Sequence, residues 1–177
     1  MQARYNRTAR LLHWLIAALL IGQFVFGWWL GDVPRNTPAR GYFVNLHKST
    51  GMLIGLLIVL RVVWRLLHTA PPLPATVARW QQRAAMASHL GLYVCMVLMP
   101  LSGYLGSNFS KHGVKFFNTV LLPPWGSDDK LLYAVFNQTH KVTAVVLLGL
   151  VVLHLLAAIK HGLQRDGIIS RIWLRPF

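Results

Sequence analysis

The chain has very few acidic residues and a single cysteine. All four acidic residues are aspartates, and charged residues make up 12% of the 177 positions, whereas a soluble domain has about 25%. The lone Cys95 excludes a disulfide framework, a cofactor attached through paired cysteines and a thiolate metal cluster. The composition therefore argues against an ordinary soluble domain and against the common cysteine-based sites.

Long apolar runs take the place of the missing charge. Four of them, at about residues 11–30, 42–67, 86–106 and 132–159, each reach the ~20 residues that a helix needs to cross a bilayer core. We therefore predict an all-α integral membrane four-helix bundle that forms a single domain over residues 1–177. Arginines precede the first run, as in a signal peptide, but the run is too long and no small-residue cleavage site follows, so we expect it to stay attached.

The distribution of basic residues predicts the orientation of the bundle. If the N-terminus is inside, the inner segments carry eleven basic residues against one acidic residue, and the outer segments carry seven against three. The positive-inside rule then places both termini in the cytoplasm. The basic residues lie beside and between the apolar runs, which favours contact with membrane lipids over nucleic-acid binding.

Two histidines bound the stretch HKVTAVVLLGLVVLH, residues 140–154. A helix turns about 100° and rises ~1.5 Å per residue, so His140 and His154 share one helix face near opposite membrane surfaces. Because successive helices alternate in direction, His47 lies at the outer level with His140, and His13 lies at the inner level with His154. The sequence therefore predicts two pairs of imidazoles at two depths.

The ligand chemistry of these pairs favours haem. Two imidazoles without a nearby carboxylate or thiolate are too few ligands for a bare first-row metal ion, whereas haem iron needs only two axial ligands beyond its porphyrin nitrogens. We therefore predict two b haems. A macrocycle also needs room, and the residue one turn after each proposed ligand is small: Ala17, Gly51, Ala144 and Ala158. Histidines that only hydrogen-bond between helices, at about 0.6 kcal/mol each, are the alternative.

Two more residues belong to the predicted inner level. Arg61 follows His47 by fourteen residues, so it lies on the same helix face at the inner level, where we predict a contact with a haem propionate. The alternative is that Arg61 snorkels to the inner surface. His89 begins the third run at the level of His13 and is a rival ligand, but the bulky Tyr93 one turn later argues against it.

These features resemble the prokaryotic dihaem cytochrome b561 family, which is related to the cytochrome b subunits of membrane formate dehydrogenases and hydrogenases. The resemblance covers the whole chain and is carried by the histidines of LLHW and LHKSTG, the fourteen-residue pair in the fourth run and Arg61. It implies a multi-pass protein of the bacterial inner membrane, with His47 and His140 on an outer haem b and His13 and His154 on an inner one. It also implies electron exchange with ubiquinone.

Some stand-alone proteins of this family pass an electron from periplasmic superoxide to quinone, so the resemblance makes superoxide our expected donor. The excess of basic residues on the outer segments suits that task, because positive charge raises the arrival rate of a small anion. Lys48 and Lys141 directly follow the outer ligands and would steer the anion over the last part of its path. Contact with lipid headgroups is the alternative for both lysines.

The inner side must supply protons if quinone is reduced there, and histidine titrates near neutral pH. His161 lies two helical turns beyond His154 and matches the family's inner quinone site, so we expect it to contact quinone and relay protons. Arg79 is expected to hold a quinone carbonyl. A plain surface histidine is the alternative for His161.

Three functions follow from the sequence, and the first is the leading one. It is an oxidoreductase that passes electrons from superoxide to ubiquinone. The second keeps the haems but makes the chain the membrane anchor of a partner dehydrogenase or hydrogenase. The third is a haem-free transporter or structural bundle whose histidines carry protons or pack helices.

Overall fold

The computed structural model describes residues 4–72 and 77–174, which form four long helices, a two-stranded hairpin and a short 3₁₀ helix. The helices α1 (Arg7–Trp29), α2 (Pro38–Leu67), α3 (Arg79–Asn108) and α4 (Lys130–Gln164) are each long and apolar enough to cross a membrane. The strands β1 (Val114–Phe116) and β2 (Val120–Leu122) lie between α3 and α4, and η1 (Ile169–Arg171) follows α4. The predicted four-helix membrane fold is confirmed.

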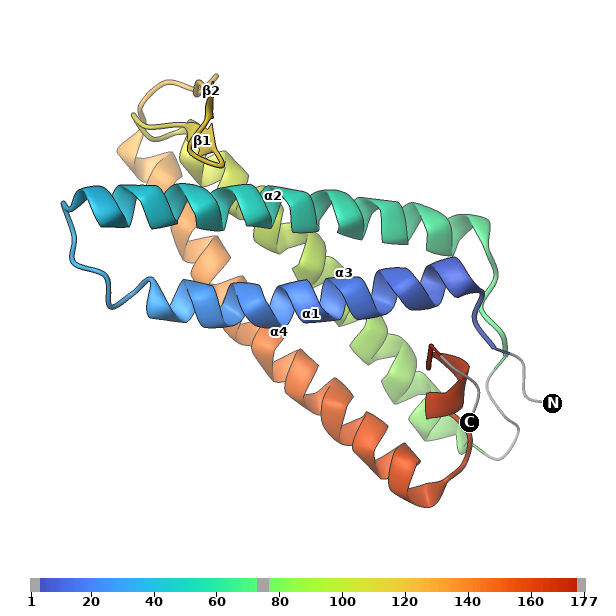
Figure 1. Cartoon of the computed structure of the whole chain (residues 1–177). Helices are drawn as coiled ribbons and strands as arrows, with labels where there is room; N and C mark the ends of the chain where they lie inside the picture. Colours follow the sequence, from blue (N-terminus) through green and yellow to red (C-terminus); the bar gives the residue numbers. More distant parts are fainter. Residues whose placement is uncertain (1–3, 73–76, 175–177) are drawn as a thin grey trace.

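The helices form two pairs that cross each other (Figure 1). α1 packs against α2, α3 packs against α4, and the contact of α2 with α3 joins the pairs. Both described ends of the chain lie at one end of the bundle, which we call the inner end; the hairpin lies at the other, the outer end. α1 and α4 do not pack closely against each other, so large side chains can meet between them.

Polar residues define where three of the helices begin. Asn6 before α1, Thr37 before α2 and Asp129 before α4 each accept a hydrogen bond from a backbone N–H of the first turn, as capping residues do. Pro38 follows at the first position of α2, where a missing N–H leaves no bond unmade. Each of these helices therefore begins a few residues before the apolar run that it contains.

Most large apolar side chains point away from the bundle. Ile16, Ile54 and Ile58 form a small buried cluster between α1 and α2, whereas Leu66 is 80% exposed and Val145 is 73% exposed. Continuous exposure of this kind is rare on soluble proteins and fits helices surrounded by lipid. The interior also contains buried polar side chains, such as those of Ser49, Ser102 and Thr143.

The hairpin at the outer end was not predicted from the sequence, because its strands have three residues each. It is fixed to α2 by polar side chains. The buried Ser49 hydroxyl accepts a hydrogen bond from Phe117 N at 2.8 Å. Asn45 Nδ2 donates to the side chain of Asn118 at 3.2 Å, and Asn45 Oδ1 accepts from Lys115 N at 3.3 Å. The hairpin therefore forms through contacts with α2.

The C-terminal segment, residues 165–174, folds back against the inner end. α4 ends at Gln164, and the next residue, Arg165, has a left-handed backbone conformation with φ 51°. Arg171 is buried, and its guanidinium donates to the carbonyls of Pro71 and Pro72. The segment thus joins the end of α4 to the loop that follows α2, and it covers part of the inner end of the bundle (Figure 1).

Candidate functional site

The structure brings together the histidines of each predicted pair. At the outer level the ring centroids of His47 on α2 and His140 on α4 are 6.3 Å apart. At the inner level those of His13 on α1 and His154 on α4 are 6.2 Å apart. The two rings are steeply inclined in both pairs, with interplanar angles of 79° and 69°. One helix, α4, thus contributes an imidazole to each level.

These separations fit an iron atom between the two rings of each pair. An imidazole nitrogen binds a first-row metal at about 2.0 Å and lies about 1.1 Å from the ring centre when C–N bonds are about 1.33 Å. Two axial imidazoles on haem iron therefore have centroids about 6.2 Å apart. Both observed separations agree closely with this value, so the residues present suit b haem.

Neutral groups hold the outer imidazoles through Nδ1. Nδ1 of His140 lies 2.9 Å from the Met99 carbonyl oxygen, and Nδ1 of His47 lies 3.1 Å from Nε2 of Gln23. Gln23 also donates to the His47 carbonyl at 2.8 Å and accepts from the Thr50 hydroxyl at 2.7 Å. A metal-bound histidine donates its other ring N–H to an acceptor, and His140 is placed to do so toward the Met99 carbonyl, whereas the Gln23 amide nitrogen at His47 is itself a donor. Within the described residues, Nε2 of both rings has no hydrogen-bond partner.

A cation and a third imidazole lie beside the inner pair. Arg61 Nη2 lies 3.3 Å from Nδ1 of His13, and Arg61 Nη1 donates to the Ala9 carbonyl at 2.9 Å. The ring of His89 on α3 has its centroid 5.6 Å from that of His154, which is less than the separation expected across an iron atom. Arg61 thus lies at the inner level, as the sequence predicts, and His89 lies next to the pair.

Two glycines at the outer level were not singled out from the sequence. A Cβ on Gly27 of α1 would lie 3.1 Å from Cε1 of His47. A Cβ on Gly103 of α3 would lie 3.1 Å from both Cε1 and Nδ1 of His140. Both outer rings therefore rest against backbone that only glycine leaves open. Gly51, expected to leave room for a macrocycle, is instead close to the amide of Gln23.

A fourteen-residue spacing relates the two levels on every helix. Four pairs of residues have this spacing: His13 and Gly27 on α1, His47 and Arg61 on α2, His89 and Gly103 on α3, and His140 and His154 on α4. Fourteen residues bring a helix back to nearly the same face about 21 Å further along. The same spacing that revealed His140 and His154 would therefore have revealed both glycines.

The predicted steering lysines have different surroundings. Lys48 Nζ donates to the Gly113 carbonyl at 2.9 Å, so this ammonium group joins α2 to the segment that leads into the hairpin. Lys141 is exposed on α4, directly after His140. Lys141 therefore presents its charge to the outer surroundings more openly than Lys48 does.

The predicted inner residues lie at helix ends. His161 is in the last turn of α4, and its Nδ1 lies 2.5 Å from Oδ2 of Asp166. Arg79 is the exposed first residue of α3. Asp166 was not among the predicted site residues.

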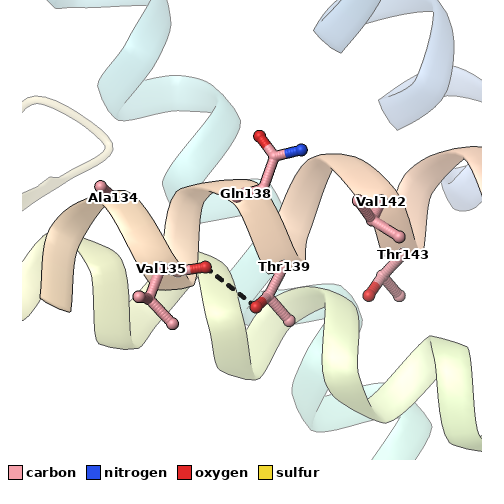
Figure 2. A pocket seen from close by; sticks show the side chains of 6 residues that line it. All are labelled: Ala134, Val135, Gln138, Thr139, Val142 and Thr143. Carbon is pink, nitrogen blue, oxygen red and sulfur yellow. Dashed lines mark hydrogen bonds between the residues drawn. The ribbon is translucent and has the colours of Figure 1, made fainter. Parts of the chain in front are cut away.

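A shallow groove of about 570 Å³ runs along the outer half of α4 (Figure 2). Its lining residues come from one helix: Ala134, Val135, Gln138, Thr139, Val142 and Thr143. The Thr139 hydroxyl donates to the Val135 carbonyl at 2.9 Å, so it is satisfied within the helix. The groove contains none of the predicted site residues.

Comparison with known proteins decides the family. Residues 4–174 match the family model described as prokaryotic cytochrome b561. The chain belongs to the prokaryotic cytochrome b561 family. Two relatives from Escherichia coli (strain K12) are similar over almost their whole length. Cytochrome b561 homolog 2 is 29% identical over 171 residues, 96% of this chain and 90% of the relative. Cytochrome b561 homolog 1 is 24% identical over 182 residues, 97% of this chain and 98% of the relative.

Membership of the cytochrome b561 family confirms several predictions. Proteins of this family are b-type cytochromes that bind b haem and transfer electrons in membranes. With four membrane-spanning helices, this cytochrome b561 family member is a multi-pass protein of the bacterial inner membrane.

Proposed function

We propose that this cytochrome b561 family member passes electrons from superoxide at the outer end, through two b haems, to ubiquinone at the inner end. The observation that carries the proposal is the occurrence of two imidazole pairs at two depths, each with a separation that suits haem iron. His47 and His140 would hold the outer haem, and His13 and His154 the inner one. Each haem, when bound, supplies an iron that takes up and releases one electron.

The charges around the two levels support electron flow toward the inner end. The groups that hold the outer imidazoles, Gln23 and the Met99 carbonyl, are neutral. The Arg61 guanidinium beside His13 is cationic, and a positive charge stabilises an added electron in its neighbourhood. The guanidinium would therefore favour an electron at the inner level. Arg61 is also suited to bind a haem propionate, because guanidinium pairs well with carboxylate.

The outer end suits an anionic donor. Lys141 is exposed beside the outer ligand His140, and the outer segments carry more basic than acidic residues. Positive charge raises the arrival rate of superoxide. Lys48, whose ammonium group is engaged by the Gly113 carbonyl, would contribute mainly through the field of its charge.

At the inner end, His161 and Arg79 would contact the quinone. Ubiquinone takes up two electrons and two protons to become ubiquinol. His161 would deliver protons, since each ring nitrogen of an imidazole can carry one. The exposed Arg79 would donate a hydrogen bond to a quinone carbonyl.

A reduction assay with purified, haem-loaded protein tests this function. Enzymatically generated superoxide should reduce the haems and then a soluble ubiquinone analogue, with ubiquinol formation followed at several salt concentrations. Salt shortens the Debye length from about 10 Å at 0.1 M to 3 Å at 1 M, so the rate should fall steeply. Lys141→Gln should lower the rate at low salt only, whereas Lys160→Gln, at the other end of α4, should leave it unchanged.

Two results would contradict the proposal. Haems that superoxide does not reduce, in a protein that copurifies with a dehydrogenase or hydrogenase, would favour the anchor subunit. Pure, folded protein without a b-type difference spectrum after dithionite would exclude haem-based electron transfer altogether.

A further inference from the structure

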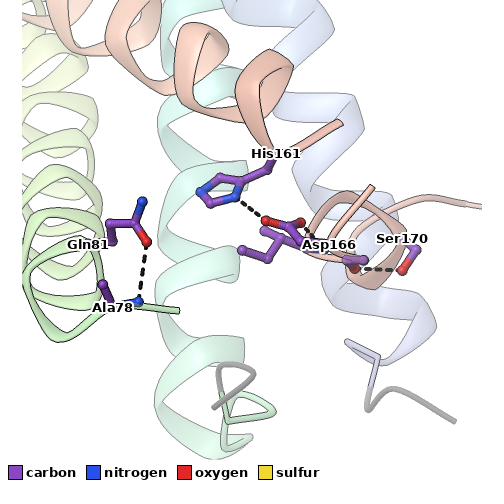
Figure 3. Close-up of polar contacts among 7 residues, drawn as sticks. Ala78, Gln81, His161, Asp166 and Ser170 are labelled. Carbon is purple, nitrogen blue, oxygen red and sulfur yellow. Dashed lines mark hydrogen bonds and ion pairs between the residues drawn. The ribbon is translucent and has the colours of Figure 1, made fainter. Parts of the chain in front are cut away.

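His161 and Asp166 form a close imidazole–carboxylate pair at the inner end of α4 (Figure 3). Nδ1 of His161 lies 2.5 Å from Oδ2 of Asp166. The side chains are 18% and 23% exposed, so the pair is mostly shielded but remains in reach of water. A charge-assisted hydrogen bond of this kind fixes both the orientation and the protonated nitrogen of an imidazole.

The carboxylate of Asp166 is itself held in place. Its Oδ1 accepts a hydrogen bond from Ile168 N at 3.0 Å, and the Ser170 hydroxyl closes the following turn by donating to the Gly167 carbonyl at 2.6 Å. A Cβ on Gly162 would lie only 2.9 Å from Cδ1 of Ile169, so the segment packs directly on the last turns of α4. Asp166 thus presents a fixed carboxylate to His161.

The other nitrogen of His161 is available. In Figure 3 the ring is drawn with its second nitrogen on the side away from Asp166, and within the described residues Nε2 has no hydrogen-bond partner. His161 lies seven residues after His154, on nearly the same face and about 10 Å further along the helix. A molecule bound at Nε2 would therefore lie between the inner level and the inner surface.

We propose that Asp166 is a positioning residue for proton delivery to the quinone. Asp166 keeps a proton on Nδ1 of His161, so that the proton on Nε2 is the one that is transferred. This inference rests on the proposed function, because it requires that quinone be reduced at the inner end.

The proton and electron balance of the step is complete. Electrons reach the quinone from superoxide, which is oxidised to dioxygen, by way of the haems. The N–H bond at Nε2 of the His161 imidazolium breaks, and an O–H bond forms on the reduced quinone. The ring that remains is neutral, with its proton on Nδ1 bonded to Asp166, and water at the inner surface returns a proton to Nε2. Two such cycles convert one ubiquinone to one ubiquinol.

Asp166 is the acidic group in contact with His161, and several cations lie at the same end of the bundle. Lys160 lies over the Trp80 ring, with Nζ 5.8 Å from its centroid. Arg79 and Arg83 on α3 are exposed. Other basic groups of the inner end have contacts of their own: Arg10 with the Trp173 carbonyl, Arg65 with the Tyr5 ring and Arg171 with the carbonyls of Pro71 and Pro72.

The test compares Asp166→Asn with Ser170→Ala in haem-loaded protein. Asp166→Asn should lower kcat for ubiquinol formation about 10- to 100-fold at pH 8 and less at pH 6. KM for the quinone analogue should stay within about 2-fold, since no contact to the quinone is removed. The rate of haem reduction by superoxide should be unchanged, because this step precedes protonation of the quinone. Both haem potentials should also be unchanged. Ser170→Ala loosens the same segment without touching the pair and should behave as the unchanged protein does.

A second readout does not depend on turnover. Nitrogen NMR of histidine-labelled protein reports which ring nitrogen carries the proton, and Asp166→Asn should change the signal of one histidine. His161→Gln identifies that signal by removing it. Asp166→Glu, which keeps a carboxylate, should restore part of the lost kcat.

The possible negative results distinguish the proposed function from the inference about Asp166. If the unchanged protein does not reduce ubiquinone, the proposed function itself is wrong. If it does, but Asp166→Asn has the same kcat at every pH and the same histidine spectrum, the inference about Asp166 is overturned. An equal loss in Ser170→Ala would also overturn it, because the effect would then come from the segment and not from the carboxylate.

Discussion

The outer and inner levels of the bundle share one geometry but differ in charge. At both levels two imidazoles approach to nearly the same separation, 6.3 Å and 6.2 Å. The remaining fourteen-residue positions are Gly27 and Gly103 at the outer level, but Arg61 and His89 at the inner level. These positions are therefore uncharged and tightly packed at the outer level, whereas at the inner level they carry a guanidinium and a third imidazole. One helical repeat can therefore produce two sites that differ in their affinity for an electron.

The two ends also differ in the side chains that hold the segment covering each of them. At the outer end, the neutral side chains of Ser49 and Asn45 on α2 bind the hairpin, and the Lys48 ammonium group binds the Gly113 carbonyl just before it. At the inner end, arginines bind backbone carbonyls of the C-terminal segment: Arg4 bonds to Ser170 and Arg10 to Trp173. The inner basic residues thus stabilise the fold, in addition to favouring the predicted orientation in the membrane.

Removing one ligand from each level gives the largest expected effect. His140→Ala should remove the outer haem and His154→Ala the inner one, so each variant should retain about one haem per chain instead of two, because one imidazole holds b haem poorly. The measurement is haem-to-protein stoichiometry together with the potential of the haem that remains. The two variants should retain haems of different potential.

His89→Ala is the matched control for this pair. It removes an imidazole of the inner level that lies 5.6 Å from His154 but is not assigned as a ligand. Both haems should remain. Loss of a haem in His89→Ala, with retention in His13→Ala, would show that the inner haem is held by α3 and α4.

A methyl group placed against an outer ring should have the next largest effect. In Gly103→Ala the new Cβ would lie 3.1 Å from two atoms of the His140 ring, so the ring or the helix must shift. Overpacking of this kind costs about 1–3 kcal/mol, which corresponds to a loss of outer haem affinity of about 5- to 150-fold. Haem titration of the apoprotein measures it.

Gly22→Ala serves as the control for Gly103→Ala. A Cβ at Gly22 would meet nothing within 4 Å, so the added methyl group should leave both haems unchanged. An equal loss of haem in the two variants would mean that the close approach at Gly103 has no special role.

Removing the inner cation should reduce the difference in potential between the two levels. Arg61→Leu should lower the inner haem potential by about 60 mV or more, since one nearby charge contributes at least ~1.4 kcal/mol at an effective dielectric near 20. The outer potential should hardly change. Arg65→Leu is the control, because Arg65 is exposed and lies over the Tyr5 ring. A spectroelectrochemical titration that finds equal inner potentials in both variants would contradict the role of Arg61.

The sequence predicts the helices and the histidine pairs well, because both depend on local, regular features. Apolar runs of sufficient length identify membrane helices, and a fixed helical repeat relates His140 to His154 without knowledge of the packing. The family comparison confirms the fold and the b-type cytochrome. The roles of individual residues as haem ligands stay predictions.

What the sequence missed depends on contacts between distant segments. The hairpin forms because Ser49 and Asn45 of α2 bind it, and no local pattern in its three-residue strands reveals this. Asp166 reaches His161 only because the chain reverses direction after α4. Lys48 was expected to steer an anion, and its contact with the Gly113 carbonyl, 65 residues away in the sequence, was not foreseen. Each miss concerns a partner that the fold supplies.

The smallest expected effect tests how the outer level is held together. In Gln23→Leu the side-chain bonds from α1 to His47 and Thr50 of α2 are lost. Hydrogen bonds between membrane helices contribute about 0.6 kcal/mol on average and at most about 1.7, so stability against detergent unfolding should fall by about 1–2 kcal/mol. Gln138→Leu changes an exposed glutamine in the α4 groove and should leave stability unchanged. Because Gln23 touches only the outer ligand of the two levels, its loss should also shift the outer haem potential and not the inner one; equal shifts of both would show that the two levels are not independent.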